Sequence, residues 1–326
     1  MHERYHIGID IGSTTIKAVV TDEKPQKTFT HYTRHNANIN ASLAQCLTLI
    51  RKQIGDASAS LRITGSIGIG VAEKCAVPFT QEVVAAARYV TTFCPEISTM
   101  IDIGGEDAKV VLFADGKPSE LRMNGNCAGG TGAFIDQMAI LMGARIDELN
   151  ELALAADHIY PIASRCGVFC KTDVQNLIAK NAARADIARS IFHAVAVQTV
   201  TTLAHGQEIT PPLLFVGGPL TFIPALRRAF TDFLKVSPDD CILPEDSSLI
   251  PAYGTALCDV GADDSSYKSV TEWIEYISRK LSNQQISATG RLPRLFNQMT
   301  TTVSGLPAKV QAQCPQHSGV KASNRK

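Results

Sequence analysis

Two segments of the chain repeat each other, and this repeat limits the fold more than any other feature. The segment "IDIGSTTIKAVV" starts at Ile9 and "IDIGGEDAKVVL" starts at Ile101, and Ile, Asp, Ile, Gly, Lys and Val recur at matching positions. Each segment is typical of two strands joined by a tight turn, because glycine permits positive φ and Ser, Thr and Asp bond their own backbone. The repeat therefore predicts two related units with a cleft between them.

Strand-like and helix-like patterns alternate through the rest of the chain, which indicates an α/β fold. Residues 182–204 form the longest segment with helical spacing, and beyond Gly261 the sequence becomes polar and rich in turn residues. We expect one unit over residues 1–95, a second over residues 96–260, and a poorly ordered tail over residues 261–326.

Composition excludes several classes of partner. The chain has 326 residues, 45% of them hydrophobic, and its 31 basic and 31 acidic residues give a formal net charge of zero. This balance provides no field that favours nucleic acid or an anionic membrane. No apolar stretch of signal-peptide length follows the N-terminus, and the longest helical pattern carries Arg184, Asp186 and Arg189. We predict a cytoplasmic protein without a transmembrane span, in which most of the nine cysteines are small core residues.

Each repeat places an aspartate near the end of a buried strand, directly before a glycine turn. Asp10 has this position in the first repeat and Asp102 in the second. Such a carboxylate can hold Mg²⁺ or its waters while the N–H groups of the turn meet phosphate oxygens. One turn of this kind could be an ordinary β-turn, but two that keep both the Asp and the Gly favour a nucleotide site. A third glycine turn, Gly217-Gly218-Pro219, follows an apolar strand and is placed to carry an adenosine moiety.

Candidate roles follow from these positions. The catalytic candidates are Asp10, Asp102 and Glu106. The candidates for binding ATP lie in or next to the glycine turns: Gly12, Ser13, Thr14, Thr15, Lys17, Gly104, Gly105, Gly129, Gly130, Thr131, Gly217, Gly218 and Pro219. Lys17 and Lys109 lie on the second strand of their repeats, where alternation directs a side chain either toward phosphate or into solvent.

The two Asp-x-Gly turns and the later strand ending in Gly-Gly resemble the actin, sugar kinase and Hsp70 ATPase superfamily. The resemblance implies a duplicated ribonuclease H-like α/β fold, with ATP and Mg²⁺ in the cleft and with domain closure coupled to hydrolysis.

Two cysteines have a setting that differs from the others. Cys127 lies just before Gly129-Gly130-Thr131-Gly132 and a predicted helix, and Cys166 lies just before another. A helix N-terminus lowers the pKa of a thiol and stabilises an anionic cluster bound to it. Two thiolates are too few for a [4Fe–4S] cluster, but two protomers related by a two-fold axis would supply four. The alternative is that both are small packing residues.

The segments "NGNCAGGTGAF" and "SRCGVFCKTDV" closely resemble the two cysteine motifs of the 2-hydroxyacyl-CoA dehydratase activators, within the benzoyl-CoA reductase ATPase-subunit family. The resemblance runs from about Tyr5 to Val260 and includes "GIDIGSTTIKAVV", "DIGGEDAKVV" and "GGPLTFIP" in the same order. It implies a homodimer with one bridging [4Fe–4S] cluster, held by Cys127 and Cys166 of each subunit. ATP binding and hydrolysis would then drive a low-potential electron into a partner iron–sulfur dehydratase or reductase, with ferredoxin or flavodoxin as the donor.

Several positions depart from the short activators. Those proteins usually have Gln where Glu106 stands, and acidic and small residues where Lys171 and Thr172 stand. These departures concern the identity of the partner and not the cluster. Cys170 lies one helical turn beyond Cys166, where packing is sufficient to explain it. Two other hypotheses stay open: a small-molecule kinase, for instance for an amino sugar, in which Asp102 acts as the base, and a regulatory ATPase without a cluster.

Overall fold

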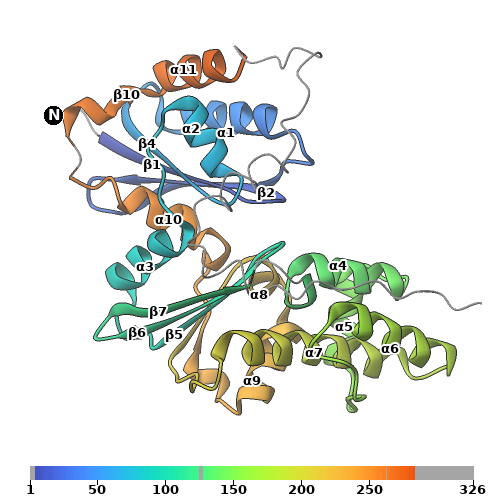
Figure 1. Ribbon diagram of the computed structural model, residues 1–326. Helices are drawn as coiled ribbons and strands as arrows, with labels where there is room; N and C mark the ends of the chain where they lie inside the picture. The colour runs from blue at the N-terminus through green and yellow to red at the C-terminus, as the bar shows by residue number, and fades with distance from the viewer. Residues whose placement is uncertain (1–3, 125–127, 262, 283–326) are drawn as a thin grey trace, which may run out of the picture. The chain divides into compact units, whose positions relative to one another are not determined.

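The computed structural model describes residues 4–124, 128–261 and 263–282. Residues 1–282 form one compact unit, and two five-stranded sheets organise it (Figure 1). The N-terminal sheet contains β1 (Arg4–Ile11), β2 (Thr15–Asp22), β3 (Lys27–Arg34), β4 (Ser58–Thr64) and β10 (Tyr267–Ser269). The C-terminal sheet contains β5 (Thr99–Ile103), β6 (Ala108–Ala114), β7 (Lys117–Asn124), β8 (Leu213–Val216) and β9 (Cys241–Ile242).

The two sheets share one arrangement of strands. The N-terminal sheet has the order β10-β4-β1-β2-β3, in which β1, β2 and β3 form an antiparallel meander and β4 runs parallel to β1. The C-terminal sheet has the order β7-β6-β5-β8-β9, in which β5, β6 and β7 form the meander and β8 runs parallel to β5. This duplication confirms the predicted fold class, a pair of ribonuclease H-like α/β units.

Strand pairing also matches at the level of residues. Asp10 pairs with Lys17, which pairs with Tyr32 on β3. Asp102 pairs with Lys109, which pairs with Met123 on β7. Because directly paired residues in a sheet point to the same face, each sheet presents a row of three equivalent side chains to one side.

Helices cover the sheets and connect them. The N-terminal sheet carries α1 (Ile39–Ile54), α2 (Gly68–Cys75) and α11 (Val270–Ser282) over one face, and their apolar side chains form one core cluster with β1, β2 and β4. A second cluster packs the C-terminal sheet against α4 (Gly132–Leu141), α5 (Ile146–Leu154), α6 (Gly167–Ala179), α7 (Arg184–Ala204), α8 (Gly218–Phe222) and α9 (Pro224–Leu234). Short 3₁₀ turns η1 (Ala128–Gly130), η2 (Pro238–Asp240), η3 (Ser247–Leu249) and η4 (Asp264–Ser266) complete the described part.

A third apolar cluster joins the two sheets through α3 (Glu82–Phe93) and α10 (Ile250–Leu257). It contains Val19 from the N-terminal sheet and Met100 from the C-terminal sheet, and Figure 1 shows both helices between the sheets. Gly254 lets α10 approach α3 closely, because a Cβ at this position would lie 1.7 Å from the carbonyl oxygen of Ala85.

The expected poorly ordered tail is wrong for its first part. Residues 267–282 form β10, which pairs with β4, and α11, which buries Val270, Trp273 and Ile277. The indole N–H of Trp273 donates a hydrogen bond to the carbonyl of Ala59 at 2.8 Å. The apolar residues of this helix have clear helical spacing, but the polar, turn-rich segments on both sides of it led to the expectation of a tail. Residues 283–326 lie outside the described part of the chain.

None of the helices in the described ranges is long and apolar enough to cross a membrane. The longest helix, α7, packs its apolar residues into the second apolar cluster and also carries charged residues such as Arg184, Asp186 and Arg189.

Candidate functional site

A cavity of about 480 Å³ lies where the two rows of paired side chains face each other. Its wall includes most of the residues predicted to bind or process nucleotide: Asp10, Gly12, Ser13, Thr14, Thr15, Lys17, Asp102, Gly104, Gly105, Glu106, Gly217, Gly218 and Pro219. Gly129, Gly130 and Thr131 are not on this wall. They are buried, and a Cβ on Gly129 or Gly130 would meet Gln198 or Thr199 of α7.

The two phosphate-type turns are built alike. The N–H of Gly12 donates to the carbonyl of Thr15 at 3.0 Å, and the N–H of Gly104 donates to the carbonyl of Asp107 at 2.8 Å. Each turn thus closes the hairpin one residue after its strand and leaves the remaining groups of the turn at the cavity.

Two glycines with positive φ fix the aspartates from the neighbouring parallel strands. Gly65 follows β4 with φ of 101°, and Gly217 follows β8 with φ of 89°. A Cβ on Gly65 would lie 2.6 Å from Asp10 Oδ1, and a Cβ on Gly217 would lie 2.6 Å from Asp102 Oδ1. Only glycine fits both the conformation and the space, so the pair holds each carboxylate close to a turn.

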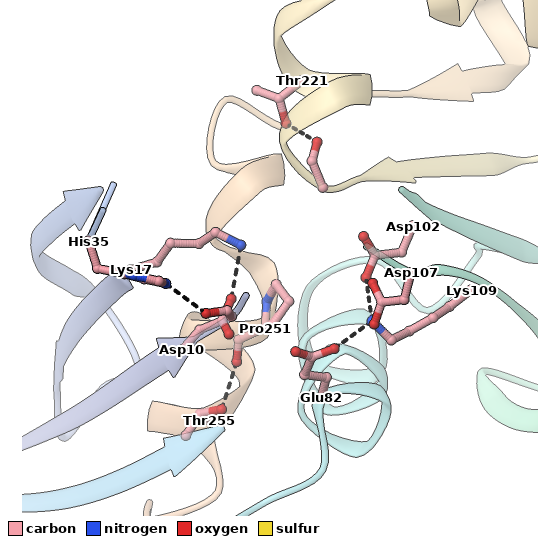
Figure 2. Close-up of polar contacts among 12 residues, drawn as sticks. Asp10, Lys17, His35, Glu82, Asp102, Asp107, Lys109, Thr221, Pro251 and Thr255 are labelled. Carbon is pink, nitrogen blue, oxygen red and sulfur yellow. Dashed lines mark hydrogen bonds and ion pairs between the residues drawn. The ribbon is translucent and has the colours of Figure 1, made fainter. Parts of the chain in front are cut away.

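Asp10 and Lys17 form the charged pair on the N-terminal side. Lys17 Nζ lies 2.9 Å from Asp10 Oδ2 (Figure 2). Burial lowers the pKa of Lys17, but the Asp10 carboxylate offsets this and holds the pKa above its ordinary value. The second oxygen of Asp10, Oδ1, is buried and finds no hydrogen-bond donor among the described residues. An orphaned carboxylate oxygen in a cavity wall fits a Mg²⁺ ion or one of its water ligands.

Lys109 occupies the equivalent position on the C-terminal side but has more carboxylate neighbours. Its Nζ lies 2.5 Å from Glu82, 2.8 Å from Asp107 and 3.9 Å from Asp102, as Figure 2 shows. Burial opposes its charge, yet these carboxylates raise the pKa of Lys109 above its ordinary value. Both lysines are therefore on the cavity side of their strands rather than in solvent, but only Lys17 has a single counter-charge.

Glu82 is a site residue that the sequence did not single out. It begins α3, lines the cavity, and contacts Lys109. Burial raises the pKa of Glu82 to about 7, against the opposing effect of Lys109. Burial likewise raises the pKa of Asp102. The available signal was an acidic residue in the first turn of the helix that connects the two repeats.

The cysteine segments are joined to the second glycine turn by backbone contacts. The N–H groups of Gly132 and Ala133, at the start of α4, donate to the carbonyls of Gly104 and Gly105 at 2.9 and 2.8 Å. Cys127 lies outside the described residues, five positions before Gly132. The turn at the cavity and the helix that follows the first cysteine motif are thus directly hydrogen-bonded.

Cys166 is the N-cap residue of α6 and is partly exposed. Gly167 beside it lies against α4 and η1, since a Cβ there would be 3.2 Å from the ring of Phe134 and 3.4 Å from Gly129. Cys170 is buried, and burial raises the pKa of its thiol to about 12, so it suits a protonated packing residue better than a thiolate ligand. A half-exposed thiol at a helix start fits an iron ligand, but the described thiols of one chain supply no cluster of three or more ligands.

Two ribonuclease H-like units with mirrored Asp-Gly turns around one cavity define a nucleotide-binding phosphotransferase or ATPase. The comparisons with known proteins narrow this class. A model of the BadF/BadG/BcrA/BcrD ATPase family matches residues 7–258, and the chain belongs to that family.

Relatives of the chain include named dehydratase activators and an uncharacterized protein. The chain is 29% identical over 217 residues to the (R)-2-hydroxyglutaryl-CoA dehydratase activating ATPase of Acidaminococcus fermentans, which covers 66% of this chain and 82% of that protein. An uncharacterized protein of Methanocaldococcus jannaschii is 31% identical over 268 residues, covering 79% of this chain but only 63% of its own length. The solved structure of the activator of the 2-hydroxyisocaproyl-CoA dehydratase from Clostridium difficile, with bound ADPNP, matches with a TM-score of 0.65 and 25% identity, over 87% of this chain and 100% of that one.

Proposed function

We propose that the protein is an ATP-dependent electron-transfer activator. It binds MgATP in the cavity and hydrolyses it. The conformational change then lets a [4Fe–4S] cluster, shared by two copies of the chain, deliver a low-potential electron to a partner iron–sulfur dehydratase or a related reductase. Ferredoxin or flavodoxin would supply that electron, in the cytoplasm. Membership of the ATPase family and the names of the relatives support this proposal.

The observation that carries the proposal is the hydrogen-bonded link between the second glycine turn and α4. Gly104 and Gly105 line the cavity, and their carbonyls accept hydrogen bonds from the first residues of the helix that follows the first cysteine motif. Any displacement of this turn by a phosphate therefore shifts the start of α4 by a similar amount. An ordinary kinase has no need for such a link.

The link continues to the second cysteine. Gly167 packs against Phe134 of α4 and against Gly129, so closely that a Cβ there would require these neighbours to shift. Cys166 directly precedes Gly167, so the start of α6 follows the start of α4 as one packed body. Nucleotide can change the cluster only by binding two conformations unequally, and this packed connection is the element on which the difference acts.

In the proposed hydrolysis, Asp10 and Lys17 on the N-terminal side bind the phosphates and Mg²⁺, and Glu82 beside Lys109 takes part in proton transfer. Lys17 is placed to exchange its contact with Asp10 for a contact with a phosphate oxygen, and Asp10 Oδ1 is placed to hold Mg²⁺ or a water ligand of it. Water attacks the γ-phosphorus, the bond from that phosphorus to the leaving oxygen of ADP breaks, and Glu82 accepts the proton of the water. A base whose pKa is about 7 is suited to this step near neutral pH.

Cys127 and Cys166 of each subunit would hold the cluster, because two subunits together supply the four thiolates that a [4Fe–4S] cluster needs. When bound, the cluster supplies one-electron chemistry at low potential. The role of this chain's residues is to hold the thiols at helix starts and to connect them to the cavity.

The test is the iron and acid-labile sulfide content of protein purified without oxygen, with the visible spectrum before and after dithionite. We expect about four of each per dimer and a broad band that bleaches on reduction. A colourless protein that cannot be reconstituted with iron and sulfide would contradict the cluster and would favour the kinase or the regulatory ATPase.

Cysteine variants sharpen this test. Cys127→Ser and Cys166→Ser should each lose the iron and keep nucleotide binding, while Cys170→Ser, the matched control from the same helix turn, should keep both. Asp10→Ala should lose most of the ATPase activity and retain iron. Iron retained at wild-type level in both single ligand variants would refute the ligand assignment.

A further inference from the structure

An aromatic pair joins the two sides of the cavity near solvent. Tyr32 on β3 belongs to the N-terminal sheet, and Phe222 ends α8, which follows β8 of the C-terminal sheet. Their ring centroids lie 5.8 Å apart with an interplanar angle of 78°, an edge-to-face contact. Both line the cavity, and both are exposed, Tyr32 to 39% and Phe222 to 61%. The pair therefore spans the cavity at a place that solvent reaches.

Tyr32 has a fixed place relative to the nucleotide groups. It is the direct strand partner of Lys17, so its side chain leaves the sheet on the same face as the lysine. Its hydroxyl lies 3.3 Å from the point that a Cβ on Gly218 would occupy. The Tyr32 ring thus reaches from the phosphate side of the N-terminal sheet to the glycine turn of the C-terminal sheet, which is the turn expected to carry adenosine.

Phe222 is presented by a helix that is held firmly. Thr221 Oγ1 donates to the carbonyl of Gly217 at 2.8 Å and lies 2.7 Å from Ser247 Oγ. Arg227 donates to the carbonyls of Leu220 and Thr221. The N–H of Ile223, directly after Phe222, donates to the carbonyl of Pro219 at 3.0 Å. Since these contacts hold the backbone before and after Phe222, the exposure of its ring is set by the fold. Nothing in the catalytic scheme uses this ring.

The opposite end of the cleft is closed by different means. There, α3 and α10 approach each other through Gly254, and their apolar side chains join the two sheets. If the cleft opens, the packed contact of α3 with α10 is suited to act as the hinge, and the aromatic pair is a contact that opening would break.

We propose that Tyr32 and Phe222 form a latch that retains the bound nucleotide, positioning it by closing the cavity over the ribose and base once the phosphates have reached Lys17. This inference rests on the proposed ATP site but not on the cluster. The edge-to-face contact stabilises the closed cleft, and its loss opens the route by which nucleotide leaves.

The experiment measures the dissociation rate of a fluorescent ATP analogue, displaced by excess unlabelled ATP, from the purified full chain. Removing either ring, by Phe222→Ala or Tyr32→Leu, should raise the dissociation rate about three- to tenfold, the range that one aromatic pair supports. The double variant should be no faster than the faster single variant, because both substitutions break the same contact.

Two control variants test whether a change in the dissociation rate is due to loss of the Tyr32 ring rather than to another effect of substitution in β3. Tyr32→Phe keeps the ring and should retain the wild-type rate. Thr30→Ala changes an exposed residue of the same strand that is not on the cavity wall, and it should also leave the rate unchanged. Both positions are exposed, so neither substitution opens a cavity in the core.

The outcomes are distinguishable. Dissociation rates of Phe222→Ala and Tyr32→Leu within twofold of the wild type would overturn the latch, and so would multiplicative effects in the double variant or a Tyr32→Phe rate equal to that of Tyr32→Leu. Failure of the wild-type chain to bind any ATP analogue would overturn the ATP site and the latch together. A protein without iron but with the expected rates would overturn the electron-transfer function and leave the latch supported.

Discussion

Asp10 and Asp102 occupy equivalent places in the two repeats, yet their surroundings give them different chemistry. Asp10 faces one lysine and keeps an oxygen without a donor among the described residues, whereas Asp102 shares Lys109 with Glu82 and Asp107. One buried lysine cannot neutralise three carboxylates, and burial together with the neighbouring carboxylates raises the pKa of Glu82 to about 7. The N-terminal side is therefore the better phosphate contact, and the C-terminal side is the better place for proton transfer.

At the residue scale, the substitution Glu82→Gln tests whether Glu82 is the base that accepts the proton of the attacking water. As a base, Glu82 acts when ionised, so the turnover number of the wild-type ATPase should rise with pH on an apparent pKa near 7. Glu82→Gln should lower turnover about 100-fold, and the remaining activity should lack this rise. The measurement is ATPase activity at saturating ATP between pH 5.5 and pH 8.5, values chosen to extend about 1.5 units on either side of that pKa. A Gln variant with the wild-type pH profile would exclude Glu82 as the base.

The same substitution has a consequence for stability. Glu82 has a folded-state pKa raised above its unfolded value of about 4.5 to about 7, so its protonation favours the folded state. That contribution is fully present below about pH 4.5 and is lost as the pH rises through about 7. The free energy of unfolding of the wild type should therefore fall relative to that of Glu82→Gln across this interval, in urea titrations without nucleotide. Asp102, whose pKa burial also raises, is present in both proteins, so its contribution largely cancels when the two free energies of unfolding are compared.

At the scale of elements, close contact between α3 and α10 decides how the two sheets are joined. A Cβ on Gly254 would lie 1.7 Å from the carbonyl oxygen of Ala85, and a Cβ on Gly8 of β1 would lie 2.1 Å from the carbonyl oxygen of Ala252. Both sides of α10 thus depend on glycine, one for α3 and one for the N-terminal sheet. The helix fits between the sheets only because no side chain intervenes.

Gly254→Ala should therefore destabilise the fold by about 3 kcal/mol, since helix backbones must separate to admit the methyl group. The matched control is Gly70→Ala in α2, where a Cβ meets nothing within 4 Å and where the higher helix propensity of Ala should stabilise by about 0.5–1 kcal/mol. Urea unfolding followed by circular dichroism measures both. Equal stability of the two variants would show that α10 adjusts without cost.

At the scale of the whole molecule, the proposed function needs a second copy of the chain, because one chain would supply only two of the four thiolates of a [4Fe–4S] cluster. The half-exposed Cys166 starts α6, whose next residues Val168 and Phe169 are 70% and 66% exposed. Apolar side chains of this size beside a ligand-type thiol suit burial in a two-fold interface. In the proposed dimer, the binding of the cluster and the association of the second subunit would each favour the other by mass action.

Sedimentation tests this dependence. The iron-loaded wild type should sediment as a dimer, while Cys166→Ser and wild type stripped of iron by a chelator should shift toward monomer. Cys170→Ser, which changes a buried thiol in the same helix, should remain a dimer with iron bound. A Cys166→Ser dimer as tight as the wild type would show that the cluster does not bridge the subunits.

The sequence predicted some parts of the fold and of the candidate site better than others. The repeat predicted both strand meanders, because an apolar strand, an Asp-Gly turn and a second strand are encoded within about twelve residues. It also placed most of the turn residues on one cavity. The helical period of α11 is clear in the sequence, with Val270, Trp273 and Ile277 on one face, and it was overlooked because polar segments rich in turn residues flank it on both sides. The sequence could not predict that Gly129 and Gly130 lie against Gln198 and Thr199 of α7 rather than on the cavity wall, because a run of glycines has the same pattern in both settings.

The sequence by itself determined the duplicated α/β units, the two aspartate turns and the two cysteine motifs, since each depends on neighbours along the chain. Only the tertiary structure decided which lysine has one counter-charge and which has three, because Glu82 reaches Lys109 from a helix outside both repeats. It alone also brought together Tyr32 and Phe222, which lie 190 residues apart in the chain (222 minus 32). Contacts of this kind depend on how whole elements pack, and no local pattern encodes that.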